Sequence, residues 1–169
     1  KDGGIRPNTS HEILNGLKLA FDENGTVTAG TASPLTDGAS AVIVCEEEYA
    51  KKNNLNILAR IKSTAVVGCP PELMGLGPIN ASKKALKRAN LEINDIDIVE
   101  LNEAFASQSI ACLKELKINP EIVNIEGGAI ALGHPLGATG TRITSKAASL
   151  MIKHNKKYAL ATQCIGLGQ

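Results

Sequence analysis

The chain has 169 residues and a formal net charge of +1, and aromatic residues make up only 2% of it although 43% is apolar. This length allows one domain with a hydrophobic core. The scarcity of aromatic residues argues against single-stranded nucleic-acid binding, and the balanced charge argues against a DNA-binding or anionic-membrane-binding surface. No apolar run is long enough to span a bilayer, and no signal-peptide pattern opens the chain. We therefore expect neither nucleic-acid nor membrane partners.

The four cysteines, Cys45, Cys69, Cys112 and Cys164, show neither Cys-x-x-Cys spacing nor a neighbouring cluster of histidines. This pattern predicts reduced thiols in a cytoplasmic protein, without a metal site or a disulfide framework. The chain starts at Lys1 without Met and stops inside a glycine-rich turn. We therefore expect it to be part of a larger protein.

The first third of the chain predicts short elements separated by turns. Apolar spacing within residues 6–25 indicates a short helix before an Asn-Gly turn, and residues 26–28 are expected to be extended. The run rich in β-branched residues at 41–45 predicts a buried strand. Residues 46–53 predict a solvated helix, because three Glu followed by paired Lys suit the helix dipole and need no further partner.

From residue 58 onward, strands and helices alternate. Strands are predicted at residues 58–68, 96–101 and 158–162, with a further extended segment at 123–125. Helices are predicted at residues 80–89, 104–116 and 139–154. This alternation predicts a layered α/β fold with a largely parallel sheet. Active sites in such sheets lie beyond the carboxyl ends of the strands, where Asn102, His134 and Cys164 fall.

One histidine stands in a glycine-rich segment between a predicted strand and a predicted helix. The sequence GGAIALGHPLGATG covers residues 127–140, and Pro135 restricts the backbone of His134 to extended geometry. Glycine permits close approach of a ligand to the backbone, and imidazole exchanges protons near neutral pH. The segment therefore indicates a catalytic histidine, although a structural turn with a solvated histidine would satisfy the same pattern.

Four motifs carry a resemblance to a known family. They are GTASPLTDGAS at residues 30–40, ELNEAFA at 100–106, the histidine segment at 127–140, and QCIGLGQ at 163–169. In this order they resemble the thiolase family over essentially the whole chain. The resemblance implies two similar halves packed as a five-layer αβαβα sandwich. Residues 1–54 would be the tail of the first half with a loop that contacts coenzyme A, and residues 55–169 the second half without its last strand.

The resemblance also implies an activity. Thiolases make or cleave the carbon–carbon bond of a 3-ketoacyl-CoA through an acyl group held on a cysteine. Such chemistry needs a thiolate, a base for the α-carbon proton, and donors for two developing oxyanions. Acyl-CoA and coenzyme A would be the substrates, with no metal or other cofactor. The full-length protein would be a cytoplasmic homodimer or homotetramer in fatty acid metabolism.

The implied site residues have structural alternatives. Cys164 would be the acid/base, and the glycines after it favour its exposure to a ligand, but a buried inert thiol is the commoner fate of cysteine. His134 would deprotonate the nucleophile and donate to the thioester oxygen. Asn102 would hold a water that supplies the partner donor, although its place before a predicted helix also suits an N-cap. The Gly166 N–H would form part of the second oxyanion hole, where a side chain would be unwelcome.

Two further residues would contact coenzyme A. Ser33 resembles the residue that bonds the pantetheine arm, and it could equally be an ordinary loop serine. Phe105 would form part of the pocket wall or of the core. The acylated cysteine of the family precedes Ser-Gly, and none of Cys45, Cys69 and Cys112 does. The nucleophile is therefore expected outside this chain.

Two other functions share part of this pattern. A thiolase-like carrier that binds coenzyme A or lipid without turnover stays open because the nucleophile is missing, although His134 and Cys164 speak against it. A nucleotide-phosphate binder using residues 127–140 is disfavoured, because that segment lacks both the Gly-Lys-Ser/Thr of a P-loop and Gly-x-Gly-x-x-Gly spacing.

Overall fold

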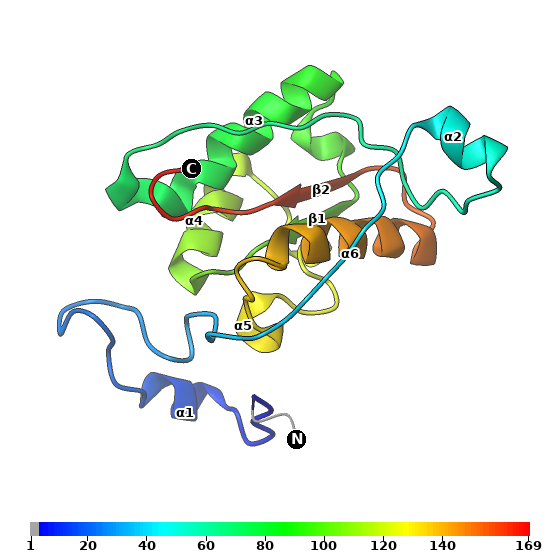
Figure 1. The fold of residues 1–169 in the computed structure, drawn as a ribbon. Helices are drawn as coiled ribbons and strands as arrows, with labels where there is room; N and C mark the ends of the chain where they lie inside the picture. The colour runs from blue at the N-terminus through cyan, green and yellow to red at the C-terminus, as the bar shows by residue number, and fades with distance from the viewer. Residues whose placement is uncertain (1–3) are drawn as a thin grey trace.

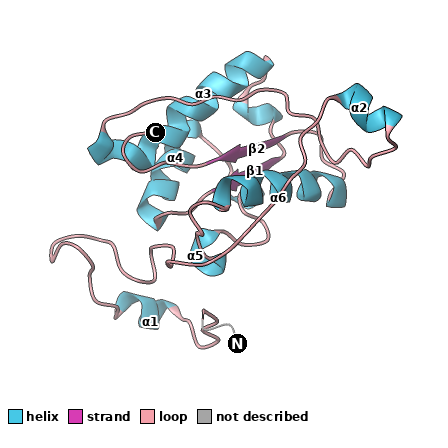
Figure 2. Cartoon of the chain, viewed as in Figure 1, coloured by secondary structure: helices cyan, strands magenta, loops and turns pink. Residues whose placement is uncertain are grey.

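The computed structural model describes residues 4–169, so the first three residues of the expected 1–54 segment lie outside the description. Its α-helices are α1 (His11–Asn15), α2 (Glu47–Lys52), α3 (Gly77–Ala89), α4 (Ala106–Leu116), α5 (Ala129–Leu132) and α6 (Thr139–Lys153). Short 3₁₀ turns are η1 (Pro71–Leu76), η2 (Ile93–Asp95) and η3 (Pro120–Ile122). The strands within residues 4–169 are β1 (Ile98–Leu101) and β2 (Ala159–Thr162), and long loops join the first elements (Figures 1 and 2).

The two strands form the centre of the molecule. They pair in parallel, with Leu101 opposite Thr162 at their carboxyl ends. Figure 1 shows them between α3 on one side and α6 on the other, and α6 contacts both strands. Because side chains alternate along a strand, Val99 and Leu101 join the apolar cluster of α3 and α4, while Ile98 and Glu100 project to the face that α6 covers. The expected parallel α/β arrangement is confirmed in this part of the chain.

The helices around the sheet begin and end close to their predicted limits. Pro78 in the first turn of α3 suits a helix start, because its missing N–H would have no partner there. Asn90 ends α3 and Lys117 ends α4, each with φ near the left-handed region at 55° and 56°. Buried side chains on one face of each helix, such as Leu86 and Cys112, then meet in one core.

Two predicted strands do not form ladders. Residues 41–45 and 58–68 lie outside every helix and strand and pair with no strand among residues 4–169. Residues 63–69 still alternate between half-buried and exposed, which is the period of a strand. The prediction of ladders at both segments is therefore wrong, because a strand exists only with a hydrogen-bonding partner. The predicted burial of residues 41–45 is also wrong, since all five are exposed.

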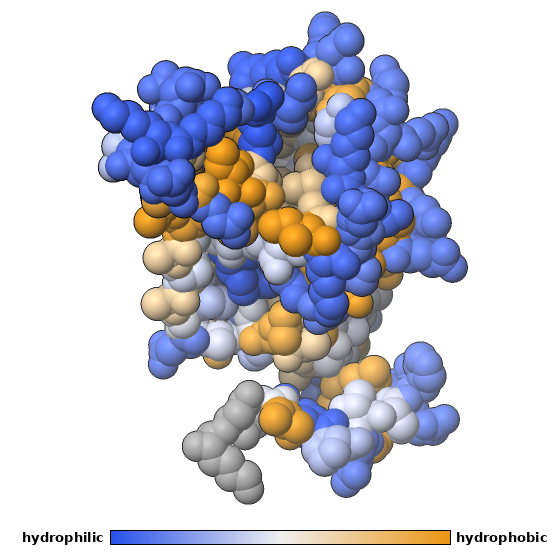
Figure 3. All heavy atoms as spheres, turned by 90° about the vertical axis from the view of Figure 1, so that its right-hand side faces the viewer, coloured by the Kyte–Doolittle hydropathy of each residue, from blue (hydrophilic) through white to orange (hydrophobic). Residues whose placement is uncertain are grey.

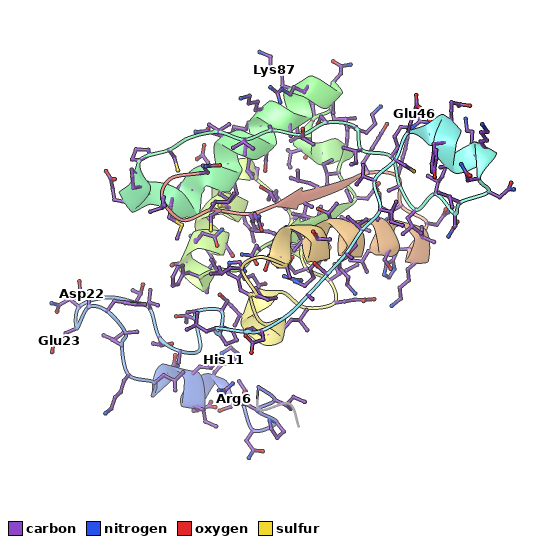
Figure 4. All side chains as sticks on the ribbon, in the orientation of Figure 1. Arg6, His11, Asp22, Glu23, Glu46 and Lys87 are labelled. Carbon is purple, nitrogen blue, oxygen red and sulfur yellow. The ribbon has the colours of Figure 1, made fainter. Side chains whose placement is uncertain are left out.

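The N-terminal helix is shorter than the helical pattern suggested. Only His11–Asn15 is helical, capped by Ser10, whose Oγ accepts from the Ile13 N–H at 3.2 Å. None of its residues is buried, so no packing extends it beyond Gly16. The labelled side chains of Arg6, His11, Asp22 and Glu23 lie on this outlying segment (Figure 4).

The surface of the first third carries apolar side chains. Ile43 is 86% exposed and Val44 is 70% exposed. Apolar patches interrupt the hydrophilic surface in the view of Figure 3. Within residues 4–169, no helix combines the length and the apolar character that crossing a membrane requires.

Candidate active site

Three loops meet beyond the carboxyl ends of the strands. Asn102 directly follows β1, and Cys164 follows β2 by two residues, so the parallel register places both at the same edge. His134 comes from the loop between α5 and α6, and its Nε2 lies 3.3 Å from Nδ2 of Asn102. The sequence motifs therefore predicted correctly that Asn102 and His134 lie together.

The hydrogen bonds of His134 define its tautomer. The Thr139 hydroxyl donates to the carbonyl of Pro135 at 3.1 Å, so its oxygen accepts from Nδ1–H of His134 at 2.7 Å. The neutral ring then keeps a lone pair on Nε2, which accepts from the Asn102 amide. Burial, with a smaller contribution from the Arg142 charge, holds the pKa of His134 below its ordinary value of 6.5. The residue is thus a neutral base at physiological pH.

Asn102 is fully buried and is held by the sheet. Its backbone N–H donates to the carbonyl of Thr162 at 3.0 Å. Its side-chain oxygen, by contrast, is buried and has no partner among residues 4–169. The N-cap of α4 is Phe105, so the helix-cap explanation of Asn102 is wrong. A buried carboxamide oxygen without a partner costs free energy, which suits a site that binds a further polar group.

Cys164 differs from the expectation. Its side chain is buried rather than exposed, and burial raises the pKa of the thiol, with small contributions from Cys112 and Cys69. The glycines after it did not produce exposure, because the turn over residues 165–169 folds back on itself through the N–H of Ile165 and the carbonyl of Gln169 at 2.8 Å. The thiol is therefore protonated at neutral pH.

Gly166 is free of steric constraint in this chain. A Cβ there would meet no atom within 4 Å, so the expectation that a side chain would be unwelcome is not met by the described residues. Its backbone N–H donates to no group among residues 4–169 and lies on the exposed turn after Cys164. That N–H is available to an acceptor from outside.

The segment 30–40 lies against the histidine loop. Thr36 packs so closely on Gly133 that a Cβ at this glycine would come within 2.4 Å of the threonine oxygen, and the φ of Gly133 is 101°. Farther along, the Ser40 hydroxyl donates to the carbonyl of Ala138 at 2.7 Å. These contacts border an open hollow of about 410 Å³ lined by Leu35, Thr36, Asp37, His134 and Leu136. His134 is therefore accessible from this hollow.

The two residues expected to contact coenzyme A have structural contacts. The Ser33 N–H and hydroxyl both donate to the carbonyl of Ala104, at 3.0 and 3.2 Å. Phe105 pairs with Ala32 in an isolated antiparallel bridge and is half-buried. Both join segment 30–40 to the loop after Asn102, and the serine oxygen keeps lone pairs for another donor.

Sequence reasoning missed three residues that support this site, Thr139, Glu103 and Asn124. Thr139 orients the imidazole of His134. Glu103 accepts hydrogen bonds from the Asn124 side chain and from the N–H of Ile130, at 2.8 and 3.0 Å. The only signal for Thr139 is its place at the start of the helix after the histidine. No local pattern marks Asn124, because its partners lie more than 20 residues away in the chain.

Comparison with known families and proteins gives a consistent result. The family described as "Thiolase, N-terminal domain" matches residues 1–48, and "Thiolase, C-terminal domain" matches residues 55–169. A 3-ketoacyl-CoA thiolase of Vibrio parahaemolyticus is 56% identical over 172 residues, covering 99% of this chain and 44% of the relative. One of Photobacterium profundum shows the same identity and coverage. The chain thus spans less than half the length of these relatives.

Solved structures show the same fold. Human mitochondrial 3-ketoacyl-CoA thiolase, solved in complex with CoA, superposes with a TM-score of 0.95 at 47% identity, over 99% of this chain and 42% of that chain. Acetyl-CoA acetyltransferase of Bacillus anthracis superposes with a TM-score of 0.96 at 42% identity, over 99% of this chain and 43% of that chain. The expected layered α/β sandwich is therefore confirmed.

Proposed function

Because this chain belongs to the thiolase family, we propose that it supplies the acid/base part of an active site that makes or cleaves the carbon–carbon bond of a 3-ketoacyl-CoA. The observation that carries the proposal is the pairing of the His134 Nε2 lone pair with the Asn102 amide, at the strand edge that also holds Cys164. A solvated turn histidine would need neither the buried amide nor the hydroxyl behind it.

The roles follow from the geometry and from the needs of the reaction. Nε2 of neutral His134 takes the proton of a nucleophilic thiol, and the resulting N–H donates to the thioester oxygen. The unpartnered Asn102 oxygen holds a water that donates to the same oxygen. Cys164, protonated at rest, donates its thiol proton to the α-carbon when the bond is cleaved, and its thiolate takes that proton back when the bond is made. The free N–H of Gly166 stabilises the second oxyanion. Ser33 and Phe105 border the pantetheine path.

The rest of the proposal concerns the whole protein. The nucleophilic cysteine lies outside this chain, since none of Cys45, Cys69 and Cys112 precedes Ser-Gly. Residues 1–54 and 55–169 belong to the two thiolase halves. The protein is a cytoplasmic homo-oligomer of fatty acid metabolism that uses coenzyme A thioesters and no metal or redox cofactor.

One experiment tests the acid/base assignment. In the full-length protein that contains this chain, Cys164→Ala should still accept an acyl group from acyl-CoA but fail to exchange the α-protons of acetyl-CoA in deuterium oxide. Exchange at the wild-type rate would remove Cys164 from this role. Wild-type protein that binds CoA without acylation or exchange would instead favour the non-catalytic carrier.

A second experiment concerns the chain by itself. Residues 1–169 should show no thiolysis of acetoacetyl-CoA and should self-associate through the apolar side chains exposed at residues 41–66. Appreciable cleavage by this purified polypeptide would place the nucleophile inside the chain and overturn the proposal on its location.

A further inference from the structure

Glu103 follows Asn102 directly and makes two hydrogen bonds to a different loop. Oε1 accepts from Nδ2 of Asn124 at 2.8 Å, and Oε2 accepts from the backbone N–H of Ile130 at 3.0 Å. In these two contacts the side-chain amide of Asn124 and the backbone N–H of Ile130 are the donors. The position therefore requires a group that accepts at both oxygens, which among side chains of this length is an ionised carboxylate.

Asn124 connects this carboxylate to the sheet. Its Oδ1 accepts from the N–H of Leu101 at 2.9 Å, and its Nδ2 donates to the carbonyl of Leu101 at 2.8 Å. Its own N–H donates to the carbonyl of Val99 at 2.9 Å. The side chain thus pairs with the end of β1 as a neighbouring strand would, and it holds the loop before α5 against the strand that Asn102 directly follows.

Gly128 leaves the space that the carboxylate occupies. A Cβ at this residue would lie 2.2 Å from the carboxyl carbon of Glu103, although the φ of Gly128, −111°, is open to any residue. Alanine at this position would therefore displace the carboxylate without straining the backbone. The Glu103 carboxylate therefore fits here only because residue 128 is a glycine without a Cβ.

The path from Glu103 to His134 is short. Ile130 is the second residue of α5, a helix of four residues whose N-cap, Gly128, has no side chain to accept from the free N–H groups. Glu103 supplies that acceptor. The helix ends where Gly133 donates to the carbonyl of Ala129 at 2.8 Å, and His134 follows. The carboxylate beside Asn102 thus fixes the start of the element whose end presents His134.

We propose that Glu103 is a positioning residue that sets the alignment of His134 with Asn102 through the N-terminus of α5. It touches neither substrate nor reacting atoms, and it acts by holding two catalytic loops at the 3.3 Å separation of Nε2 and Nδ2. The inference rests on the proposed thiolase function for its kinetic consequence, but the structural consequence can be measured without turnover.

The test uses two variants of the full-length protein that change the contact in different ways. Glu103→Gln removes the charge and turns an amide group toward one of the two donors. Gly128→Ala keeps the charge and displaces the carboxylate. Both should lower kcat for thiolysis about tenfold to a hundredfold and leave KM for the 3-ketoacyl-CoA nearly unchanged, because misalignment affects the reacting groups rather than substrate binding. Glu121→Gln, at an exposed carboxylate of η3, is the matched control and should do neither.

The imidazole of His134 provides the readout that does not depend on activity. Burial lowers the pKa of this ring, so loss of the contact should move its NMR titration upward toward the ordinary value in both variants. Glu103→Asp keeps two accepting oxygens but is one methylene shorter, so its kcat and its His134 titration should lie between those of wild type and Glu103→Gln. It replaces the glutamine variant in the test if that variant does not fold. Folded variants with wild-type kcat and wild-type His134 titration would overturn the inference. Inactive wild-type protein would refute the proposed function alone, and the titration would still decide the role of Glu103.

Discussion

Residues 4–70 and residues 71–169 use similar apolar patterns with opposite results. In the first region only Thr28 and Ala50 are buried. In the second, Val99 and Cys112 are 0% exposed and lie in a continuous core. The β-branched run at 41–45 resembles β1 in composition, yet β1 is buried along its whole length. Whether an apolar run forms a buried strand therefore depends on a partner element as well as on its own pattern.

The site lies where these two regions meet. The first region is joined to the loops of the candidate site by a small number of hydrogen bonds, among them two from Ser33 to the carbonyl of Ala104 and one from Ser40 to the carbonyl of Ala138. The second region supplies Asn102, His134 and Cys164 from loops at the edge of a packed sheet. Packed elements thus hold the proposed site residues, and a more loosely held segment borders the hollow beside His134.

The largest difference between the regions should appear in core truncations. Leu150 of α6 is 1% exposed, so Leu150→Ala should lower the free energy of unfolding of residues 1–169 by about 2–5 kcal/mol through lost transfer energy and a cavity. Ile43→Ala, at an 86% exposed side chain, should change it by less than about 0.5 kcal/mol. Urea unfolding in dilute solution measures both. An equal loss of unfolding free energy in the two variants would mean that residues 41–45 are buried by self-association. Unfolding measured at several protein concentrations would then show that stability depends on concentration.

A second prediction concerns Asn102, whose buried side chain lies in the site between the two regions. Asn102→Ala should lower thiolysis by the full-length protein about 10²–10³-fold, as loss of one oxyanion donor does. Asn102→Asp should be worse, because an acceptor would replace the amide that donates to Nε2 of His134 and an anion would stand beside the developing negative charge. Turnover and melting temperature are measured together. An active, stable aspartate variant would show that Asn102 has no catalytic part.

The sequence predicted the second region far better than the first. From α3 onward each predicted helix and strand lies within a few residues of its predicted limits, because periodicity and end signals agree with the tertiary contacts. The four-residue helix α5 was not predicted, because its glycine-rich surroundings carry no helical pattern. Whether residues 41–45 and 58–68 form paired strands could not be predicted from their own residues, since a local apolar pattern contains no information about the pairing partner. The N-terminal helix was predicted too long for the same reason, as no packing surface supports it.

The site was predictable only where local motifs describe it. The motifs brought Asn102 and His134 together correctly, but they did not show that Cys164 is buried or that Asn102 caps no helix. The contact of Glu103 with Asn124 spans 21 positions and depends on a left-handed backbone at Asn124, with φ at 46°. Such contacts follow from the assembled fold and leave no periodic signal.

A third prediction sharpens the comparison through pH. Burial raises the pKa of Glu100 from 4.5 to about 7, against the opposing charges of Arg142 and Lys146. The unfolded chain releases this proton near 4.5 while the folded chain keeps it, so the free energy of unfolding falls as pH rises through that window and is constant above it. Glu100→Gln should match wild type near pH 4.5 and be more stable at pH 8 by up to about 3 kcal/mol.

The measurement is urea unfolding of both proteins across this pH range. Glu121→Gln, which removes one negative charge from an exposed position, is the control and should not reproduce the growing difference. A constant difference between wild type and Glu100→Gln at every pH would show that folding does not raise the pKa of Glu100.

The smallest effect is expected at the other extreme of burial, in α1. The Ser10 hydroxyl caps this helix, and removing such a cap costs an isolated helix about 1 kcal/mol. Because no residue of α1 is buried, the helix opens without disturbing the core, so Ser10→Ala should change the global free energy of unfolding by less than about 0.5 kcal/mol. Hydrogen exchange distinguishes local opening of α1 from global unfolding. Amides of His11–Asn15 should exchange nearly as fast as those of an unstructured peptide, and faster still in the Ser10→Ala variant. Amides of Thr139–Lys153 should exchange only through global unfolding. Protection of α1 equal to that of α6 would contradict the division of the chain into a packed and an unpacked region, and it would place α1 against a surface that covers it in solution.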